Sequence, residues 1–258
     1  MTDEGRSIEL SIEVPGTPEA VWQAIATGPG ITSWYVPHDV EPRDGGSMSA
    51  SFGPGMDVTG RVGAWEPPER VRFDPGDGGP GLAFEWTIEA HHDRGTCTVR
   101  LVNSGFGSGA DWDDQYDGMT EGWQLFLQNL HAHLTHFPAE AATASLPMAM
   151  WGGSSNAVWD RLTTDLGVPA HPAVGDRLTA DGGDGLTLSG EVLAAGEHAV
   201  LLLVDRPCRG TAFFAVEGRG EVRSVSIWTY LYGDAGAAVS ADDGPRWAQW
   251  LTARGVAG

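Results

Sequence analysis

The chain contains no lysine, and its 15 arginines face 35 Asp and Glu, so that its 258 residues carry a net charge of −20. A surface this acidic repels phosphate backbones and anionic lipid headgroups. We therefore expect neither nucleic-acid nor membrane partners. The acidity itself favours solubility and indicates no particular partner.

Cysteine is almost absent. Cys97 and Cys208 are the only two, they form no Cys-x-x-Cys motif, and no cluster of His and Cys surrounds them. The sequence therefore predicts neither a disulfide framework nor a structural zinc site. We expect no metal and no cofactor.

Long apolar segments are also missing. The longest aliphatic run, residues 199–204, falls far short of the roughly 20 residues that span a bilayer. The N-terminus shows no charged region followed by an apolar one, as a signal peptide would. The prediction is a cytoplasmic protein.

The common catalytic motifs are absent as well. The sequence shows no Gly-x-Ser-x-Gly, no P-loop and no Gly-x-Gly-x-x-Gly before a predicted helix. No Ser/His/Asp or Cys/His arrangement can be identified from spacing. This absence favours binding over catalysis, although an enzyme that uses a single acid or base stays an alternative.

Tryptophan, glycine and a repeated phrase are what the chain does have. It contains 11 Trp, 37 Gly and 16 Pro, and 41 % of its residues are hydrophobic, which favours a strand-rich fold with real cores. The segment "VPGTPEAVW" at 14–22 is echoed by "WGGSSNAVW" at 151–159. In each, a hydroxyl residue, Thr17 or Ser154, stands where a helix N-cap is expected.

The echo continues along the chain in the same order. Residues 60–73 correspond to 190–203, 82–89 to 211–217, 97–102 to 222–231, and 121–130 to 245–254. Such an ordered series predicts a tandem duplication with domains at 1–138 and 145–258, joined by a linker at 135–144. Each unit is expected to run strand, helix, several antiparallel strands and a C-terminal helix.

The predicted fold class is α+β. Phe84, Trp86 and Ile88 alternate with Glu85, Thr87 and Glu89, as in an antiparallel sheet with one wet face. The helix expected at about 113–137 carries an apolar stripe that can cover the other face. That stripe consists of Tyr116, Met119, Trp123, Phe126, Leu127, Leu130, Leu134 and Phe137.

Five segments of the first half resemble a known superfamily. They are "ITSWYVP" (31–37), "GRVGAWEPPERVRF" (60–73), "EWTIE" (85–89), "TVRLVNSGF" (98–106) and "YDGMTEGWQLFLQNLHAHL" (116–134). Together they resemble the START-like, or SRPBCC, superfamily, and within it the bacterial branch related to the activator of the heat-shock chaperone ATPase. The second half resembles the family only through its echo of the first, which indicates a degenerate copy.

The resemblance implies two tandem helix-grip units, each a curved antiparallel sheet wrapped on a C-terminal helix around a hydrophobic cavity. It places Trp34 and Tyr35 at the cavity mouth, and it implies further ligand-binding residues Phe84, Trp86, Asn103, Tyr116, Trp123, Phe126 and Leu127. The alternative is that these aromatic side chains are ordinary core residues around a collapsed cavity.

The remaining polar candidates for the site are arginines and histidines. Arg61 and Arg100 are candidates for orienting a ligand, but strand alternation turns Arg100 outward if Val99 and Leu101 face the core. Three histidines, His131, His133 and His136, lie near the end of the long helix without metal-binding spacing, and we expect them to be exposed.

The family's range of activities leaves three functions open. The first is binding of a bulky hydrophobic small molecule, such as a polyketide, a lipid or another secondary metabolite, in antibiotic biosynthesis or self-resistance. The second is a cyclase, aromatase or hydrolase acting on such a molecule, and the third is a chaperone-regulating interaction module. Fold alone does not choose among them.

The second unit is expected to be the weaker of the two. Its last helix, read from "PRWAQWLTARG" at 245–255, offers only Trp247, Trp250 and Leu251 over about three turns. We therefore expect a monomer in which the second unit packs on the first, which holds the larger cavity.

Overall fold

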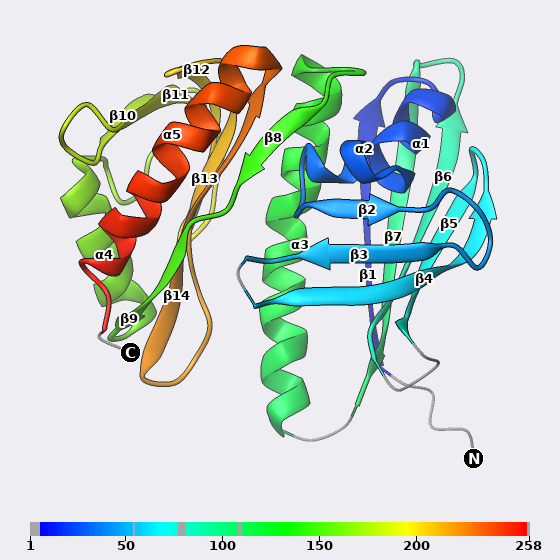
Figure 1. Cartoon of the computed structure of the whole chain (residues 1–258), viewed down its shortest axis with the longest axis horizontal. Helices are drawn as coiled ribbons and strands as arrows, with labels where there is room; N and C mark the ends of the chain where they lie inside the picture. Colours follow the sequence, from blue (N-terminus) through cyan, green and yellow to red (C-terminus); the bar gives the residue numbers. More distant parts are fainter. Residues whose placement is uncertain (1–5, 54, 77–80, 108–109, 257–258) are drawn as a thin grey trace. The chain divides into compact units, whose positions relative to one another are not determined.

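A computed structural model of the chain describes residues 6–53, 55–76, 81–107 and 110–256. The chain forms two compact units, Met1–Ala141 and Ala142–Gly258 (Figure 1). Each unit combines an antiparallel sheet with helices, so the predicted α+β class and the tandem helix-grip arrangement are confirmed. None of the described helices is long and apolar enough to cross a membrane.

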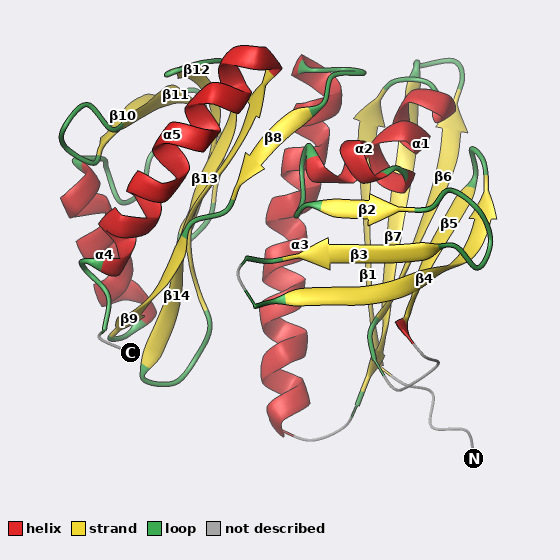
Figure 2. Ribbon diagram, in the orientation of Figure 1, coloured by secondary structure: helices red, strands yellow, loops and turns green. Residues whose placement is uncertain are grey.

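The first unit is built on a seven-stranded sheet in the order β1-β7-β6-β5-β4-β3-β2 (Figure 2). Its strands are β1 (Arg6–Pro15), β2 (His38–Val40), β3 (Ser47–Ser51), β4 (Asp57–Glu66), β5 (Arg70–Pro75), β6 (Ala83–His91) and β7 (Thr96–Phe106). Helices α1 (Pro18–Ala26) and α2 (Gly28–Thr32) connect β1 to β2, and α3 (Ala110–His136) follows β7. The long helix α3 packs against β1.

The second unit also contains a seven-stranded sheet, in the order β10-β11-β12-β13-β14-β8, with β9 paired to β14. Its strands are β8 (Ala142–Ser145), β9 (Met148–Gly152), β10 (Arg177–Asp181), β11 (Thr187–Ala195), β12 (Ala199–Arg206), β13 (Gly210–Glu217) and β14 (Val222–Tyr232). Helix α4 (Ser155–Leu166) packs against β13 and β10, and α5 (Gly233–Thr252) packs against β14, β8 and β9.

The two units repeat each other in backbone detail. The register slips between Val62 and Ala64 on β4, and in the same way between Val192 and Ala194 on β11. Such bulges bend a strand locally and are specific features of a fold. Their recurrence at matched residues supports the duplication inferred from the echoed phrases.

The helices that carry the echoed phrases start in the same way. The Thr17 hydroxyl accepts a hydrogen bond from the Ala20 amide at 3.3 Å, and the Ser154 hydroxyl accepts one from Ala157 at 3.4 Å. Both predicted N-caps are thus confirmed. Trp22 and Trp159, which follow them, are 4 % and 1 % exposed, so the repeated phrase supplies core residues to each unit.

We expect Thr17→Ala and Ser154→Ala each to lower the free energy of unfolding by about 1 kcal/mol, because each leaves a helix amide without its capping acceptor. Urea denaturation followed by circular dichroism measures the change. Ser49→Ala, in an exposed position of β3, is the control and should stay within about 0.5 kcal/mol of wild type. Equal effects from all three variants would contradict the assignment.

The copies differ at two places. Among the described residues, the second sheet has no counterpart of β2, since its edge strand β10 corresponds to β3. Its first strand is divided at Pro147 into β8 and β9, both of which pair with β14. The connection between the units is also shorter than the linker expected at 135–144, because α3 continues to His136 and β8 starts at Ala142.

The final helix of the second unit was predicted too short. α5 contains 20 residues and begins at Gly233, with Pro245 inside it rather than at its start. The residues before Pro245 are mostly Ala, Gly, Ser and Asp, which show no apolar stripe. Gly236 packs so closely on β14 that a Cβ atom at this position would lie 2.5 Å from the backbone of Leu231. Contact with β14 therefore favours a helix in a segment whose sequence has no helical apolar stripe.

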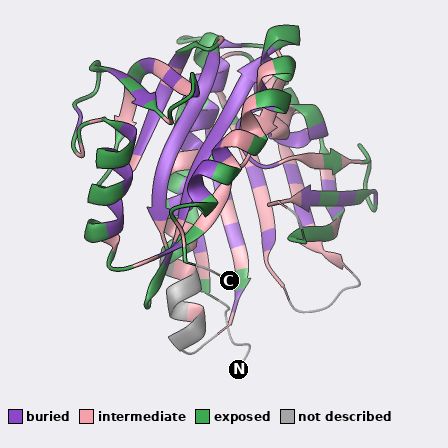
Figure 3. Cartoon of the chain, turned by 60° about the vertical axis from the view of Figure 1, so that its left-hand side comes forward, coloured by how far each residue is buried: buried purple, intermediate pink, exposed green. Residues whose placement is uncertain are grey.

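The second unit has a dense core. It combines Trp151, Trp159 and Trp247 with inward-facing residues such as Phe214 and Ile227 of β13 and β14, all at most 2 % exposed. The other face of these two strands is buried too, as the continuous purple of the long strands shows (Figure 3). This double burial explains why neither strand alternates cleanly between apolar and polar residues.

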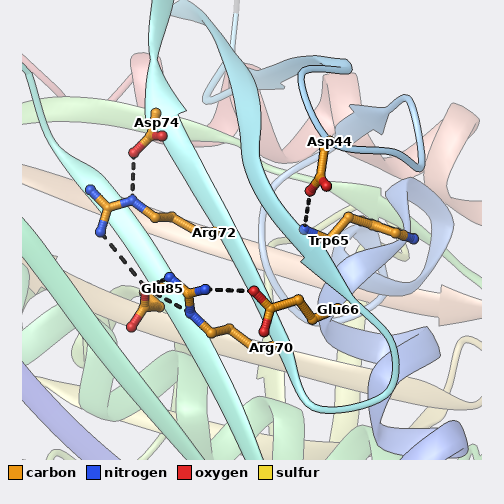
Figure 4. A network of polar contacts seen from close by, with 7 residues as sticks. All are labelled: Asp44, Trp65, Glu66, Arg70, Arg72, Asp74 and Glu85. Carbon is orange, nitrogen blue, oxygen red and sulfur yellow. Dashed lines mark hydrogen bonds and ion pairs between the residues drawn. The ribbon is translucent and has the colours of Figure 1, made fainter.

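The outer face of the first sheet is charged instead. Arg70 on β5 bonds Glu85 on β6 at 2.7 Å and Glu66 on β4 at 2.8 Å, and Arg72 bonds Asp74 at 2.7 Å (Figure 4). Glu85 therefore points away from the face that carries Trp86, as the alternation predicted. Partly exposed pairs of this kind contribute little stability individually, but they keep this face polar.

Candidate functional site

The candidate site lies where α3 meets the inner face of the first sheet, and the segment after α2 anchors it. The indole Nε1 of Trp34 donates to the Ala24 carbonyl at 2.9 Å, which fixes the segment to α1. From the other side, the amide Nδ2 of Asn129 on α3 donates to the Trp34 carbonyl at 2.8 Å. The next residue, Tyr35, is thereby held against α3.

Tyr35 stands at the centre of a cluster of aromatic rings. Its ring centroid lies 4.6 Å from that of Phe126 and 4.8 Å from that of Trp123 on the same helix. From the sheet, Phe84 and Trp86 approach Trp123 to 5.6 and 5.5 Å. We call these residues, together with Trp34 and Phe52, the aromatic cluster: Trp34, Tyr35, Phe52, Phe84, Trp86, Trp123 and Phe126.

The indole nitrogen of Trp123 is paired with a buried amide beside the aromatic cluster. Asn103 on β7 is fully buried, accepts from Trp123 Nε1 at 3.3 Å and donates to the Ala83 carbonyl at 3.1 Å. Asn103 therefore orients Trp123. Its role as a ligand-binding residue stays a prediction.

The other residues predicted for the site are placed as follows. Leu127, 4 % exposed, lies on α3 beside Phe126. Tyr116 is apart from the aromatic cluster: its ring meets Phe106 at 5.2 Å, its hydroxyl donates to the Ser7 carbonyl at 3.1 Å, and the Arg6 guanidinium covers its face. Tyr116 thus joins the start of α3 to β1.

The aromatic cluster continues to solvent along the hairpin of β3 and β4. Ala50 on β3 pairs with Val58 on β4, so both face inward, yet Val58 is 49 % exposed. At the turn, Phe52 is half-buried and Met56 is 40 % exposed. We call Phe52, Met56 and Val58 the mouth, an apolar rim next to Tyr35, whose ring lies 5.9 Å from that of Phe52.

One titratable residue stands beside the aromatic cluster. His38 begins β2 and pairs with Ala50, which puts its side chain on the inner face. Its ring lies 5.7 Å from Tyr35 and 6.5 Å from Phe73. Its Nδ1 is 2.8 Å from the Val36 carbonyl, which can only accept, so Nδ1 carries the proton and Nε2 does not.

Burial lowers the pKa of His38 from 6.5 to about 4, against a smaller opposing effect of the bond to Val36. The folded protein therefore holds this imidazole neutral at physiological pH. As the pH falls below 6.5 the unfolded chain takes up this proton first, so His38 makes the fold progressively less stable down to about pH 4.

Sequence reasoning missed both His38 and Asn129. Asn129 is fully buried, and its Oδ1 accepts no hydrogen bond from the residues that the structure describes. The pairing of His38 with Ala50, and the approach of α3 to Trp34, are contacts between distant residues that no local pattern shows. The only available signal was the position of His38 directly after the aromatic "WYVP" segment.

The three histidines of α3 do not behave alike. His131 and His136 are exposed as predicted, but the prediction was wrong for His133, which is 3 % exposed. Burial lowers the pKa of His133 to about 4. Among the described residues, no group of three or more His, Cys, Asp or Glu side chains is arranged to hold a metal ion.

The arginine candidates lie on the outside. Arg61 on β4 is exposed, so it cannot orient a ligand on the inner face as envisaged. Arg100 on β7 pairs with Glu9 of β1 on the outer face, which confirms the argument from strand alternation. Both arginines occupy strand positions whose side chains point to the outer face of the sheet.

Comparison with known proteins covers the first unit best. Residues 15–135 match the model of the family described as "Activator of Hsp90 ATPase homolog 1-like protein". No curated protein is similar enough to the chain to count as a match.

Several solved structures are similar at low identity. Protein MLL2253 from Mesorhizobium loti is 23 % identical with a TM-score of 0.45, over 51 % of this chain and 98 % of its own. DynU16, described as a putative protein in the dynemicin biosynthetic locus, is 17 % identical with a TM-score of 0.44, over 96 % of each chain. The di-domain ARO/CYC BexL from the BE-7585A biosynthetic pathway is 15 % identical with a TM-score of 0.43, over 98 % of this chain and 99 % of its own.

The family match falls within the unit that carries the aromatic cluster and includes every ligand-binding residue predicted from the sequence. It confirms the resemblance inferred from the five segments. Residues 15–135 therefore match the activator of Hsp90 ATPase homolog 1-like family, a match consistent with the START-like superfamily that the five segments resemble.

Proposed function

We propose that the first unit binds a bulky, apolar, aromatic small molecule, such as a polyketide, against the aromatic cluster. The observation that carries this proposal is the continuity of the inner face, from the buried ring of Trp123 to the exposed side chain of Val58. Binding sites for small molecules are mostly apolar and contain a few placed polar groups. Aromatic rings offer such a ligand faces and edges for stacking.

The distribution of exposed apolar side chains supports a ligand over a protein partner. Within the described part of the first unit, Met56 and Val58 of the mouth are the only large hydrophobic residues that are exposed. The outer face of the sheet carries ion pairs instead (Figure 4). A module that docks onto a chaperone would need an apolar patch on its outside.

The ligand enters, in this proposal, beside Phe52 at the turn of β3 and β4. Phe52, Phe84 and Phe126 are half-buried, whereas Trp34, Trp86 and Trp123 are at most 4 % exposed. The more accessible phenylalanines are therefore the rings that move or stack first. A role in antibiotic biosynthesis or self-resistance goes with this ligand class and is best tested by the identity of the neighbouring genes.

We expect saturable binding of 1-methoxypyrene, measured as energy transfer from the tryptophans of the aromatic cluster to the pyrene. The double variant Met56→Gln/Val58→Thr should weaken binding about thirtyfold, because each of the two apolar side chains contributes about 1 kcal/mol to contact with the ligand. The matched control is Met150→Gln/Val222→Thr, two residues of the second unit that are 42 % and 38 % exposed. The proposal fails if 1-methoxypyrene does not bind, or if both doubles weaken it equally.

A further inference from the structure

The unprotonated nitrogen of His38 is the polar feature of the inner face that the fold leaves available. The backbone amide of His38 donates to the Thr32 hydroxyl at 3.0 Å, and that hydroxyl donates to the Gly28 carbonyl at 2.7 Å. With Nδ1 bonded to Val36, three hydrogen bonds fix the strand start and the ring. No described residue forms a hydrogen bond with Nε2.

Among the described residues, no charged side chain faces this nitrogen. Its neighbours are Thr32 from α2, Tyr35 from the following segment, Ala50 from β3 and Phe73 from β5. Asp39, the adjacent residue on β2, is exposed on the opposite side of the strand. Of the described side chains around the ring, the Tyr35 phenol is the only other ionisable group.

Several donors of the aromatic cluster are already used. Trp34 donates to Ala24, Trp123 donates to Asn103, and Asn103 donates to Ala83. Two acceptors, Nε2 of His38 and Oδ1 of Asn129, are left over at the segment that carries Tyr35. An acceptor in apolar surroundings is satisfied by a hydroxyl and repels a carboxylate.

We propose that Nε2 of His38 accepts a hydrogen bond from a hydroxyl of the bound molecule, so that the site selects hydroxylated aromatic compounds over their ethers and carboxylates. This inference rests on the proposed function. It makes His38 a specificity-determining residue and confines that specificity to the first unit. Among the described residues, the second sheet lacks the strand that carries His38.

The test uses three ligands of one shape on the full chain: 1-hydroxypyrene, 1-methoxypyrene and 1-pyrenecarboxylate. We expect wild type to bind 1-hydroxypyrene about tenfold more tightly than 1-methoxypyrene, and 1-pyrenecarboxylate most weakly. 1-Hydroxypyrene can donate a hydrogen bond to Nε2 of His38, whereas 1-methoxypyrene leaves this acceptor unpaired. The net contribution of one such hydrogen bond corresponds to a difference in affinity of this size.

His38→Phe keeps a ring in place and removes the acceptor. In this variant the hydroxyl preference should vanish while 1-methoxypyrene binds as in wild type. His38→Gln, which restores an acceptor oxygen, should recover part of the preference. His198→Phe replaces a partly buried histidine of the second unit that pairs with Asn156, and it should leave the preference unchanged.

A pH series adds a readout that a purely structural role would not move. Because burial lowers the pKa of His38 to about 4, the preference should persist below the ordinary imidazole pKa of 6.5 and disappear only near pH 4. Loss of the preference near pH 6.5, or its survival in His38→Phe, overturns the assignment to His38. If wild type binds none of the three pyrenes, the proposed function itself is wrong.

Discussion

Replacing Trp123 with alanine is expected to lower the free energy of unfolding by about 3–5 kcal/mol, the range for removing a large ring from a core. Trp123 is 3 % exposed and meets the rings of Tyr35 at 4.8 Å and Trp86 at 5.5 Å. The substitution also leaves Oδ1 of the buried Asn103 without its donor, and an unpaired buried acceptor is costly.

Urea denaturation followed by circular dichroism measures this loss. Trp123→Phe is the matched control, because it keeps a ring against Tyr35 and removes mainly the hydrogen bond to Asn103. We expect Trp123→Phe to cost less than half as much as the alanine variant. Similar losses from both variants would mean that the hydrogen bond, and not ring packing, holds this part of the unit together.

The second large effect is expected from Trp159→Ala in the second unit, again about 3–5 kcal/mol. Trp159 is 1 % exposed, and its Nε1 donates to the Ala170 carbonyl at 2.8 Å, which ties the chain after α4 to that helix. Hydrogen exchange should show lost protection in α4 and in the strands that it covers, β13 and β10.

Trp22→Ala is the corresponding change in the first unit and tests the equivalence of the echoed phrases. Trp22 is 4 % exposed and makes an edge contact with Trp65, with the ring centroids 5.0 Å apart. We expect a comparable loss, with reduced protection in α1 and β6. A loss below about 1 kcal/mol in either variant would show that the repeated tryptophan is not a core residue in that unit.

Local chemistry and periodicity were enough to predict much of the fold. The N-caps Thr17 and Ser154 could be read directly, because capping depends on residues within one turn. The alternation around Trp86 predicted which side chains face the core, since successive strand residues point to opposite faces. The ordered echo predicted the duplication, although not the second unit's long helix or its divided first strand.

The composition of the candidate site was only partly predictable. The sequence and its family resemblance named six of the seven residues of the aromatic cluster, all but Phe52. They did not separate Tyr116 from the aromatic cluster, although Tyr116 lies near the start of α3 and contacts Phe106. The reason is that helical periodicity predicts the face of a helix on which a residue lies, but not its neighbours along the helix. They also suggested Arg61 as a ligand-orienting residue, whereas its position on β4 directs its side chain to the outer face.

The sequence by itself therefore determined the two units, the inward and outward phases of β6 and β7, and the aromatic character of the first unit's interior. Only the tertiary structure decided that His38 is half-buried and His133 fully buried, both of them neutral, that Asn129 reaches the Trp34 carbonyl, and that α5 begins at Gly233. The physical reason is the range of the interactions. Caps and alternation arise between near neighbours, whereas burial, a shifted pKa and a helix without an apolar stripe depend on contacts between residues far apart in the chain.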